Sequence, residues 1–95
     1  MISLPASSTV NVSELVGRTI RMRRELAKIS LADMAKAQGL TSSGWSRIET
    51  GETELTVSRL VKAAELLGVI PSDILHEVEL HLVFAAQASS MRMRP

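Results

Sequence analysis

Apolar residues recur at helical spacing through most of the chain. Asn11 and Glu14 form a capping-box pattern, in which the first side chain accepts a hydrogen bond from a backbone N–H of the helix start. Val16 and Ile20 follow four residues apart, as on one face of an amphipathic helix. The pattern predicts a first helix over about 12–28.

Two shorter helices are predicted next. Ser30 and Asp33 form a second capping pattern, and the helix that they begin ends at Gly39. Thr41 caps a third helix, and Gly51 marks its end because glycine adopts the left-handed conformation that is common after a helix. The inward-facing residues of these two helices are predicted to be Leu31, Met34, Ala35, Trp45 and Ile48.

Two further helix starts follow. Thr56 caps a fourth helix that Gly68 ends, and Pro71 suits the first turn of a fifth helix because its φ angle is already helical. The apolar residues that repeat at helical spacing in these two segments are Val57, Leu60, Ala64, Leu67, Ile74 and Leu75.

The pattern changes between residues 77 and 84. Val78, Leu80, Leu82 and Phe84 alternate with the residues between them, and a period of two favours a strand with one buried face. A helical continuation of the fifth helix also fits the apolar positions, but the strand is the preferred interpretation. The predicted fold is therefore all-α, with five helices followed by a C-terminal β-strand.

The predicted organisation has four parts. A flexible N-terminal arm (1–10) precedes the helical domain (11–76), and a strand (77–86) leads to a flexible tail (87–95). A single apolar strand promotes aggregation unless it is paired, and a two-fold dimer would pair it with its copy. The alternative is that the segment packs on the core of its own chain. The predicted dimer interface consists of Val78, Leu80, Leu82 and Phe84.

The composition narrows the class of protein. The chain has 95 residues, 45% of them hydrophobic and 22% charged, which is the ordinary range for one globular domain. Cysteine is absent, so disulfides and cysteine-ligated metals are excluded. No apolar run approaches the ~20 residues of a membrane helix, and no secretory signal is evident. A cytoplasmic location without membrane contact is expected.

Catalytic chemistry has little support in the sequence. No serine lies in a nucleophile-elbow pattern. His76 and His81 are five residues apart, which suits neither a metal pair on a helix nor one face of a strand. The sequence therefore predicts no enzyme activity, no metal and no cofactor.

The segment from Leu31 to Gly51 carries the functional prediction. Two helices that meet at a sharp angle need a small residue where their backbones touch, and Ala35 supplies it. The turn needs a residue that tolerates positive φ, and Gly39 supplies that. Trp45 then fills the core from one side, which leaves the other face of the third helix free for the major groove of DNA.

With this spacing the chain resembles the helix-turn-helix class of the phage Cro and repressor proteins, the Xre family, over about residues 14–76. The resemblance implies five helices and the binding of double-stranded operator DNA as a homodimer. The residues that carry it are Ile20, Arg24, Ser30, Ala35, Gly39, Trp45, Ser46, Arg47, Ile48, Glu49, Gly51, Leu60, Leu67, Gly68, Val69, Ile74 and Leu75.

The resemblance also implies site residues. The third helix would lie in the major groove, with Ser42, Ser43, Ser46 and Arg47 facing outward. Arg47 is the best base reader, because a guanidinium can bind guanine at two acceptors; a phosphate contact or a solvated charge is its alternative role. The serines specify little, because a hydroxyl can pair with any base. Ser42 and Ser43 could equally be helix caps.

Two more residues match a structural pair of the phage repressors. Arg24 and Glu49 would form an ion bridge between the first and third helices. Trp45 stands where the family usually has an aliphatic residue, and its expected role is to fill the core rather than to stack on a base.

The sequence also departs from the family. Leu31 stands where many members have a glutamine that binds a phosphate, and the loop after Gly51 carries Glu52 and Glu54 where relatives have basic residues. Either this loop points away from DNA, or affinity is modest and depends on dimerisation. The spare candidates for phosphate contacts are Arg18, Arg21, Lys36, Arg92 and Arg94.

The predicted function is a transcriptional repressor that binds an inverted repeat as a homodimer, with half-sites ~34 Å apart. The main alternative is an antitoxin, since some antitoxins of this family have a repressor domain followed by a dimerising strand. The other alternative is an interaction module that binds another regulator. The net charge of only +1 fits these alternatives, which add a toxin or regulatory protein to the expected partners.

Overall fold

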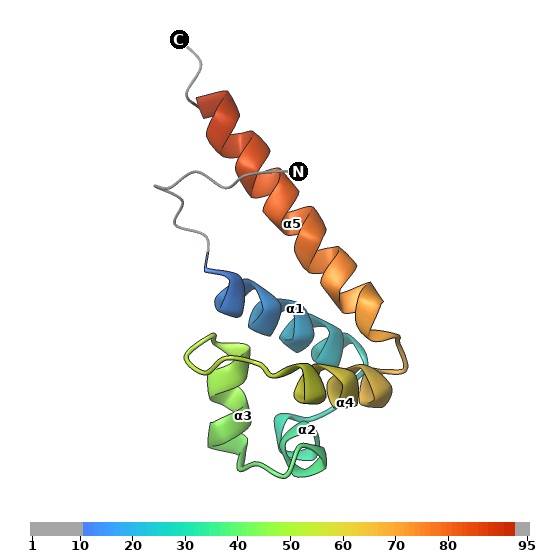
Figure 1. Cartoon of the computed structure of the whole chain (residues 1–95). Coiled ribbons are helices and arrows are strands. Elements are labelled where there is room, and N and C mark those ends of the chain that lie inside the picture. Colours follow the sequence, from blue (N-terminus) through green and yellow to red (C-terminus); the bar gives the residue numbers. More distant parts are fainter. Residues whose placement is uncertain (1–10, 93–95) are drawn as a thin grey trace.

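The structure, a computed structural model, describes residues 11–92, with side chains described to residue 87. It contains five α-helices and, within these residues, no β-strand (Figure 1). The predicted arm at 1–10 lies outside the described residues. The helices are α1 (Val12–Leu26), α2 (Leu31–Ala37), α3 (Ser42–Glu49), α4 (Val57–Leu67) and α5 (Pro71–Arg92).

The four predicted N-caps of α1 to α4 are confirmed. Each cap side chain accepts the backbone N–H three residues later, which satisfies one of the amides that a helix start leaves without a partner. The distances are 3.1 Å for Asn11, 3.0 Å for Ser30, 3.0 Å for Thr41 and 3.2 Å for Thr56. Local sequence therefore determines where these helices begin.

The first helix ends two residues earlier than its apolar pattern suggests. Lys28 adopts a left-handed conformation with φ of +59°, and the N–H of Ile29 returns to the carbonyl of Arg24 at 3.1 Å. This closure turns the chain toward α2 within four residues, so α2 can pack against α3 and α4.

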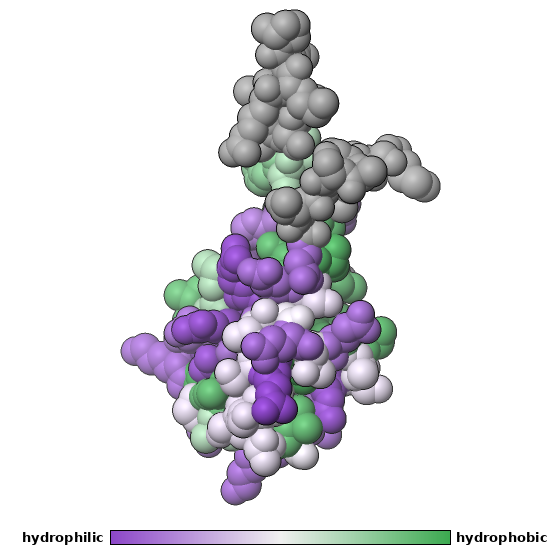
Figure 2. Space-filling model, turned by 90° about the vertical axis from the view of Figure 1, so that its left-hand side faces the viewer, coloured by the Kyte–Doolittle hydropathy of each residue, from purple (hydrophilic) through white to green (hydrophobic). Residues whose placement is uncertain are grey.

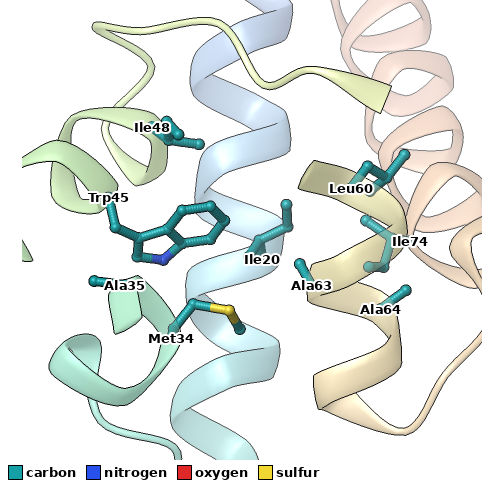
Figure 3. Packing of buried hydrophobic residues seen from close by; sticks show 9 residues of the cluster. All are labelled: Ile20, Met34, Ala35, Trp45, Ile48, Leu60, Ala63, Ala64 and Ile74. Atoms are coloured by element: carbon teal, nitrogen blue, oxygen red, sulfur yellow. The ribbon is translucent and has the colours of Figure 1, made fainter. Parts of the chain in front are cut away.

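The core lies around α1 and contains residues from all five helices (Figure 3). α1 contacts α3, α4 and α5, while α2 contacts α3 and α4. Trp45 and Met34 are fully buried and face Ile20 of α1 from one side, while Ala63 and Ile74 approach it from the other. The cluster consists of Ile20, Met34, Ala35, Trp45, Ile48, Leu60, Ala63, Ala64 and Ile74.

The contact between α1 and α3 depends on a missing side chain. Gly17 is buried on α1, and a Cβ placed there would collide with the backbone carbonyl oxygens of Ile48 and Glu49. Glycine therefore allows the backbone of α1 to touch the last turn of α3. Any larger residue would force the two helices apart.

The predicted C-terminal strand is wrong, because residues 77–86 belong to α5. Their alternating pattern also matches helical spacing from Ile74 through Val78 to Leu82, and Ile74 and Val78 are buried. A helix satisfies its own backbone amides, whereas a lone strand leaves them unpaired. The predicted tail is also helical as far as Arg92, and 93–95 lie outside the described residues.

In the helix, the four residues of the predicted dimer interface do not share one face. Val78 is only 4% exposed and packs within its own chain, so it is not available to a second copy. Leu80 and Phe84 lie four apart on a different side of α5 and are exposed, while Leu82 is half-buried. A dimer contact on this helix would therefore use a different set of residues from a strand.

α5 extends well beyond the rest of the molecule (Figure 1). Its first turns pack against α1 and α4, and its distal half leaves the helical body. Within the described part of the chain, no helix is both long enough and apolar enough to cross a membrane.

Candidate nucleic-acid interface

The turn between α2 and α3 has the conformation that its residues require. Gly39 has φ of +69°, and the N–H of Leu40 returns to the carbonyl of Ala35 at 2.9 Å. Ala35 is 1% exposed, so its small side chain lies where the two helices meet. The turn sets the angle at which α3 leaves α2.

The inner and outer faces of α3 are chemically different. Trp45 and Ile48 are buried in the core, whereas Ser42, Ser43 and Arg47 are exposed. Ser46 is half-buried, so it lies at the edge of the outer face. Figure 2 views the molecule from the side on which α3 lies in Figure 1, and this face is mostly hydrophilic or intermediate, with hydrophobic residues mainly at its margins.

Arg47 has its guanidinium free for an external ligand. Its side chain forms no ion pair and no hydrogen bond within the described part of the chain, although its carbonyl accepts the Thr53 N–H at 3.1 Å and the Thr50 hydroxyl at 3.2 Å. The backbone of this residue is thus held while its charged end remains in solvent. This combination suits a side chain that reaches into a groove.

The two other predicted DNA contacts lie on different helices. Lys36 is exposed on α2 and has no ion pair among the described residues. Arg21 is exposed on α1 and lies 3.6 Å from Glu25, a surface pair that contributes little. Arg21 and Arg18 also line a shallow hollow beside Thr50, at the C-terminal end of α3. The structure thus places Arg21, but not Lys36, next to that end of α3.

The loop after α3 carries two carboxylates. Glu52 and Glu54 are both exposed. Glu54 also lines an apolar hollow of about 350 Å³ between α1, α4 and α5, together with Val12, Val57 and Leu75. Glu54 therefore lies on the α1–α4–α5 side of the loop.

A buried ion pair supports α3 from behind. Arg24 Nε lies 2.7 Å from Oε2 of Glu49, and Arg24 Nη2 lies 3.0 Å from Oε1, so the contact is bidentate. The third nitrogen, Nη1, donates to the carbonyl of Ile29 at 2.9 Å. The hydrogen bond with Glu49 raises the pKa of Arg24 despite the opposing effect of burial, so the charge persists. The pair fixes the end of α3 to α1.

Two polar contacts of the α2–α3 region were not predicted from the sequence. Trp45 Nε1 donates to Oε2 of Glu49 at 2.7 Å, and their i, i+4 spacing on a helix could have indicated this contact. Gln38 Nε2 donates to the carbonyl of Arg59 at 3.1 Å, while Arg59 Nη1 donates to the carbonyl of Gln38 at 2.7 Å. No local signal reveals this second contact, because the residues are 21 apart.

Comparison with solved structures shows the same fold in a bacterial regulator. A crystal structure of the clp gene regulator ClgR from Corynebacterium glutamicum matches with a TM-score of 0.79 and 21% identity, over 90% of each chain. A second crystal structure of ClgR matches with a TM-score of 0.71 and 23% identity, over 77% of this chain and 95% of that one. At this identity the likeness concerns the fold. No curated protein sequence matches the chain.

Comparison with protein families gives a more direct result. The helix-turn-helix domain family matches residues 15–77, which is most of the chain and includes α2, the turn and α3. The match agrees with the buried Ala35, the positive φ of Gly39 and the two-sided character of α3. The chain belongs to the helix-turn-helix domain family.

Proposed function

We propose that this protein is a sequence-specific DNA-binding transcriptional regulator, of the type found in the Xre family, that represses by occupying an inverted-repeat operator as a homodimer. The observation that carries the proposal is the outer face of α3. Its exposed side chains are short hydroxyls and one guanidinium, and all of them can bond to base edges or phosphates. We propose no catalytic activity, because the helix-turn-helix fold serves the recognition of DNA.

Rigidity behind this face supports base reading. Trp45 is fully buried, and Glu49 is held by both Arg24 and Trp45. A recognition helix must hold its side chains within about 0.5 Å of the positions from which they bind the base edges. The ion pair and the core together restrain α3 for that purpose, with Arg47 as the base reader and Ser42, Ser43 and Ser46 as base or phosphate contacts.

Phosphate contacts are assigned to Lys36 and Arg21. Both are exposed, and they come from two helices other than α3. Such contacts fix the register of a protein on the duplex without reading sequence. Because the net charge is only +1, affinity must come from these few local cations and from two-site binding by a dimer.

The homodimer is proposed to form through the projecting half of α5. Leu80 is 45% exposed and Phe84 is 66% exposed, and Leu82 and Val83 are half-buried beside them. Large apolar residues that gather on a projecting helix mark an interaction surface. A second copy can bury them by two-fold symmetry, and binding of an inverted repeat requires the two copies of α3 to lie about one DNA turn, ~34 Å, apart.

Selection from random duplex DNA at near-physiological salt tests the proposal. Enrichment of an inverted repeat with half-sites about one helical turn apart would support operator binding by a dimer. Weak binding that vanishes with added salt, without enrichment of any sequence, would refute sequence-specific recognition. A reporter gene with the selected repeat across its promoter tests repression. We expect lower expression of the reporter when the protein is present.

A second candidate function is that of an antitoxin or an interaction module that binds another regulator. The exposed Glu52 and Glu54 next to α3 favour it, because carboxylates near a DNA backbone oppose binding. In an antitoxin the projecting α5 would carry the protein contact. Failure of the DNA selection would favour this candidate.

A further inference from the structure

α5 leaves the body of the protein abruptly. Ile74 is 0% exposed and Val78 is 4% exposed, but no described side chain from 79 to 87 is buried. The first two turns of the helix are thus its anchor. Because a helix is stiff, a small change in the angle of this anchor moves the distal end by a much larger distance.

One directional contact holds the anchor. Arg23 of α1 lies beside Glu77 of α5, with its Nε 3.0 Å and its Nη2 2.9 Å from the same carboxylate oxygen, Oε1. Within the described residues, no other side-chain hydrogen bond or ion pair joins α5 to the first four helices. Apolar contacts at Ile74 and Val78 favour burial but impose little direction, whereas charged hydrogen bonds prefer defined angles.

The ion pair between Arg23 and Glu77 is partly shielded from solvent. The Arg23 side chain is 26% exposed and the Glu77 side chain is 30% exposed, in contrast with the i, i+4 pairs elsewhere on α1, whose side chains are more than half exposed. Partial burial weakens solvent screening and lowers the number of positions that the two side chains sample.

The residue next to Arg23 on α1 also forms an ion pair with another helix. Arg23 binds Glu77 of α5, and the next residue, Arg24, binds Glu49 at the end of α3. One turn of α1 therefore connects the recognition helix to the projecting helix through two ion pairs. The position of α3 and the direction of α5 are thus both restrained from the same turn of α1.

We propose that Arg23 and Glu77 form a positioning pair that sets the direction in which α5 leaves the body, and thereby the spacing between the two recognition helices of the dimer. This inference rests on the proposed function of dimeric operator binding. Neither residue is proposed to contact DNA or the second copy. Their role is to select one half-site separation among those that a less restrained α5 would allow.

The first test measures binding to a series of inverted repeats. The half-sites are those selected by the wild-type protein, and their separation varies one base pair at a time. The wild type is expected to bind one separation best. Arg23→Ala and Glu77→Ala should flatten this profile and weaken binding at the best separation by about fivefold, the factor equivalent to ~1 kcal/mol, while binding to an isolated half-site remains unchanged.

The charge-swapped double variant provides the rescue. Arg23→Glu combined with Glu77→Arg restores the ion pair and should recover a sharp spacing profile, which loss of helix stability alone would not do. Glu65→Ala removes one exposed carboxylate from α4 and serves as the control with wild-type spacing. An unchanged profile in both single variants, with dimer and helix content retained, would overturn the positioning role.

A second test does not require DNA. Because the chain has no cysteine, Thr50→Cys on the C-cap of α3 and Gln87→Cys on α5 can carry two spin labels at defined, exposed sites. Dilution with unlabelled protein leaves only distances within one chain. We expect a narrow distance distribution in the labelled wild type and a broader one with Glu77→Ala. Equal widths would overturn the proposal even if operator binding succeeds, whereas failed DNA selection with a broadened distribution would count against dimeric operator binding alone.

Discussion

The indole N–H of Trp45 donates a hydrogen bond of 2.7 Å to Oε2 of Glu49, one turn further along α3. The same oxygen accepts Nε of Arg24, also at 2.7 Å. A buried carboxylate is unfavourable unless it is well hydrogen-bonded, and here a charge and an indole satisfy it together. The bond explains how a tryptophan can be fully buried here: its ring fills the core and its polar atom has a hydrogen-bond partner.

The ion pair behind α3 should contribute strongly to stability. Glu49→Gln is expected to lower the free energy of unfolding by about 3 kcal/mol, because it leaves the buried Arg24 charge without a counter-ion. Urea unfolding followed by circular dichroism measures this. Glu52→Gln removes an exposed carboxylate from the next loop and should change stability by less than about 0.5 kcal/mol. Equal effects in the two variants would contradict the role of Glu49.

The close contact of α1 and α3 predicts an unusual response at Gly17. Alanine normally stabilises a helix relative to glycine, but Gly17→Ala should destabilise the protein by about 1–3 kcal/mol because its Cβ meets the backbone of α3. Thermal unfolding compares it with Gly44→Ala. The Cβ at 44 meets only side-chain atoms, the nearest being Thr41 Oγ1 at 3.2 Å, so its effect should be smaller. A Gly17→Ala protein with an unchanged or higher Tm would show that the helices are further apart.

Arg47 should carry sequence preference. Arg47→Ala is expected to reduce discrimination at one base pair of each half-site by about 1–3 kcal/mol while leaving the free energy of unfolding unchanged, because its exposed guanidinium forms no hydrogen bond and no ion pair within the described part of the chain. Fluorescence anisotropy with the selected operator and its single-base variants measures this.

The matched control for Arg47 removes the same charge elsewhere. Lys62→Ala affects an exposed cation on α4 and should leave base preference intact. If Arg47→Ala instead weakened binding to all sequences equally, its contact would be with a phosphate and base reading would be wrong.

The projecting helix should control oligomeric state. Leu80→Ser together with Phe84→Ser is expected to convert the dimer into a monomer with its helical body intact, because both side chains are exposed beyond the core. Light scattering gives the mass, and circular dichroism gives the helix content. His76→Ser, at another exposed position on α5, is the control. A double variant that retains the dimer mass would place the interface elsewhere.

The helix starts could be predicted because their signals are local. Asn11, Ser30, Thr41 and Thr56 each bond to an amide three residues away, so neither the signal nor the contact depends on distant parts of the chain. The turn at Gly39 was equally accessible, since positive φ strongly favours glycine. The candidate face of α3 follows from the inward spacing of Trp45 and Ile48.

The C-terminal segment could not be decided in this way. Residues 77–84 fit both a period of two and the spacing from Ile74 through Val78 to Leu82. Burial against α1 and α4 selects the helix, since it places Ile74 and Val78 in the core while Leu80 and Phe84 remain outside. The strand prediction failed because it counted the apolar residues without knowing which surface was available to cover them.

The sequence by itself determined where α1 to α4 begin, how α2 turns into α3, and which residues of α3 face the core. Each of these depends on backbone conformation or hydrogen bonds within a few residues. Only the tertiary structure decided the form of α5, the contact of Arg23 with Glu77 and the close approach at Gly17. The residues of the ion pair are 54 positions apart, and those of the glycine contact are about 30 apart. Such residues meet only when burial of the shared core brings their helices together.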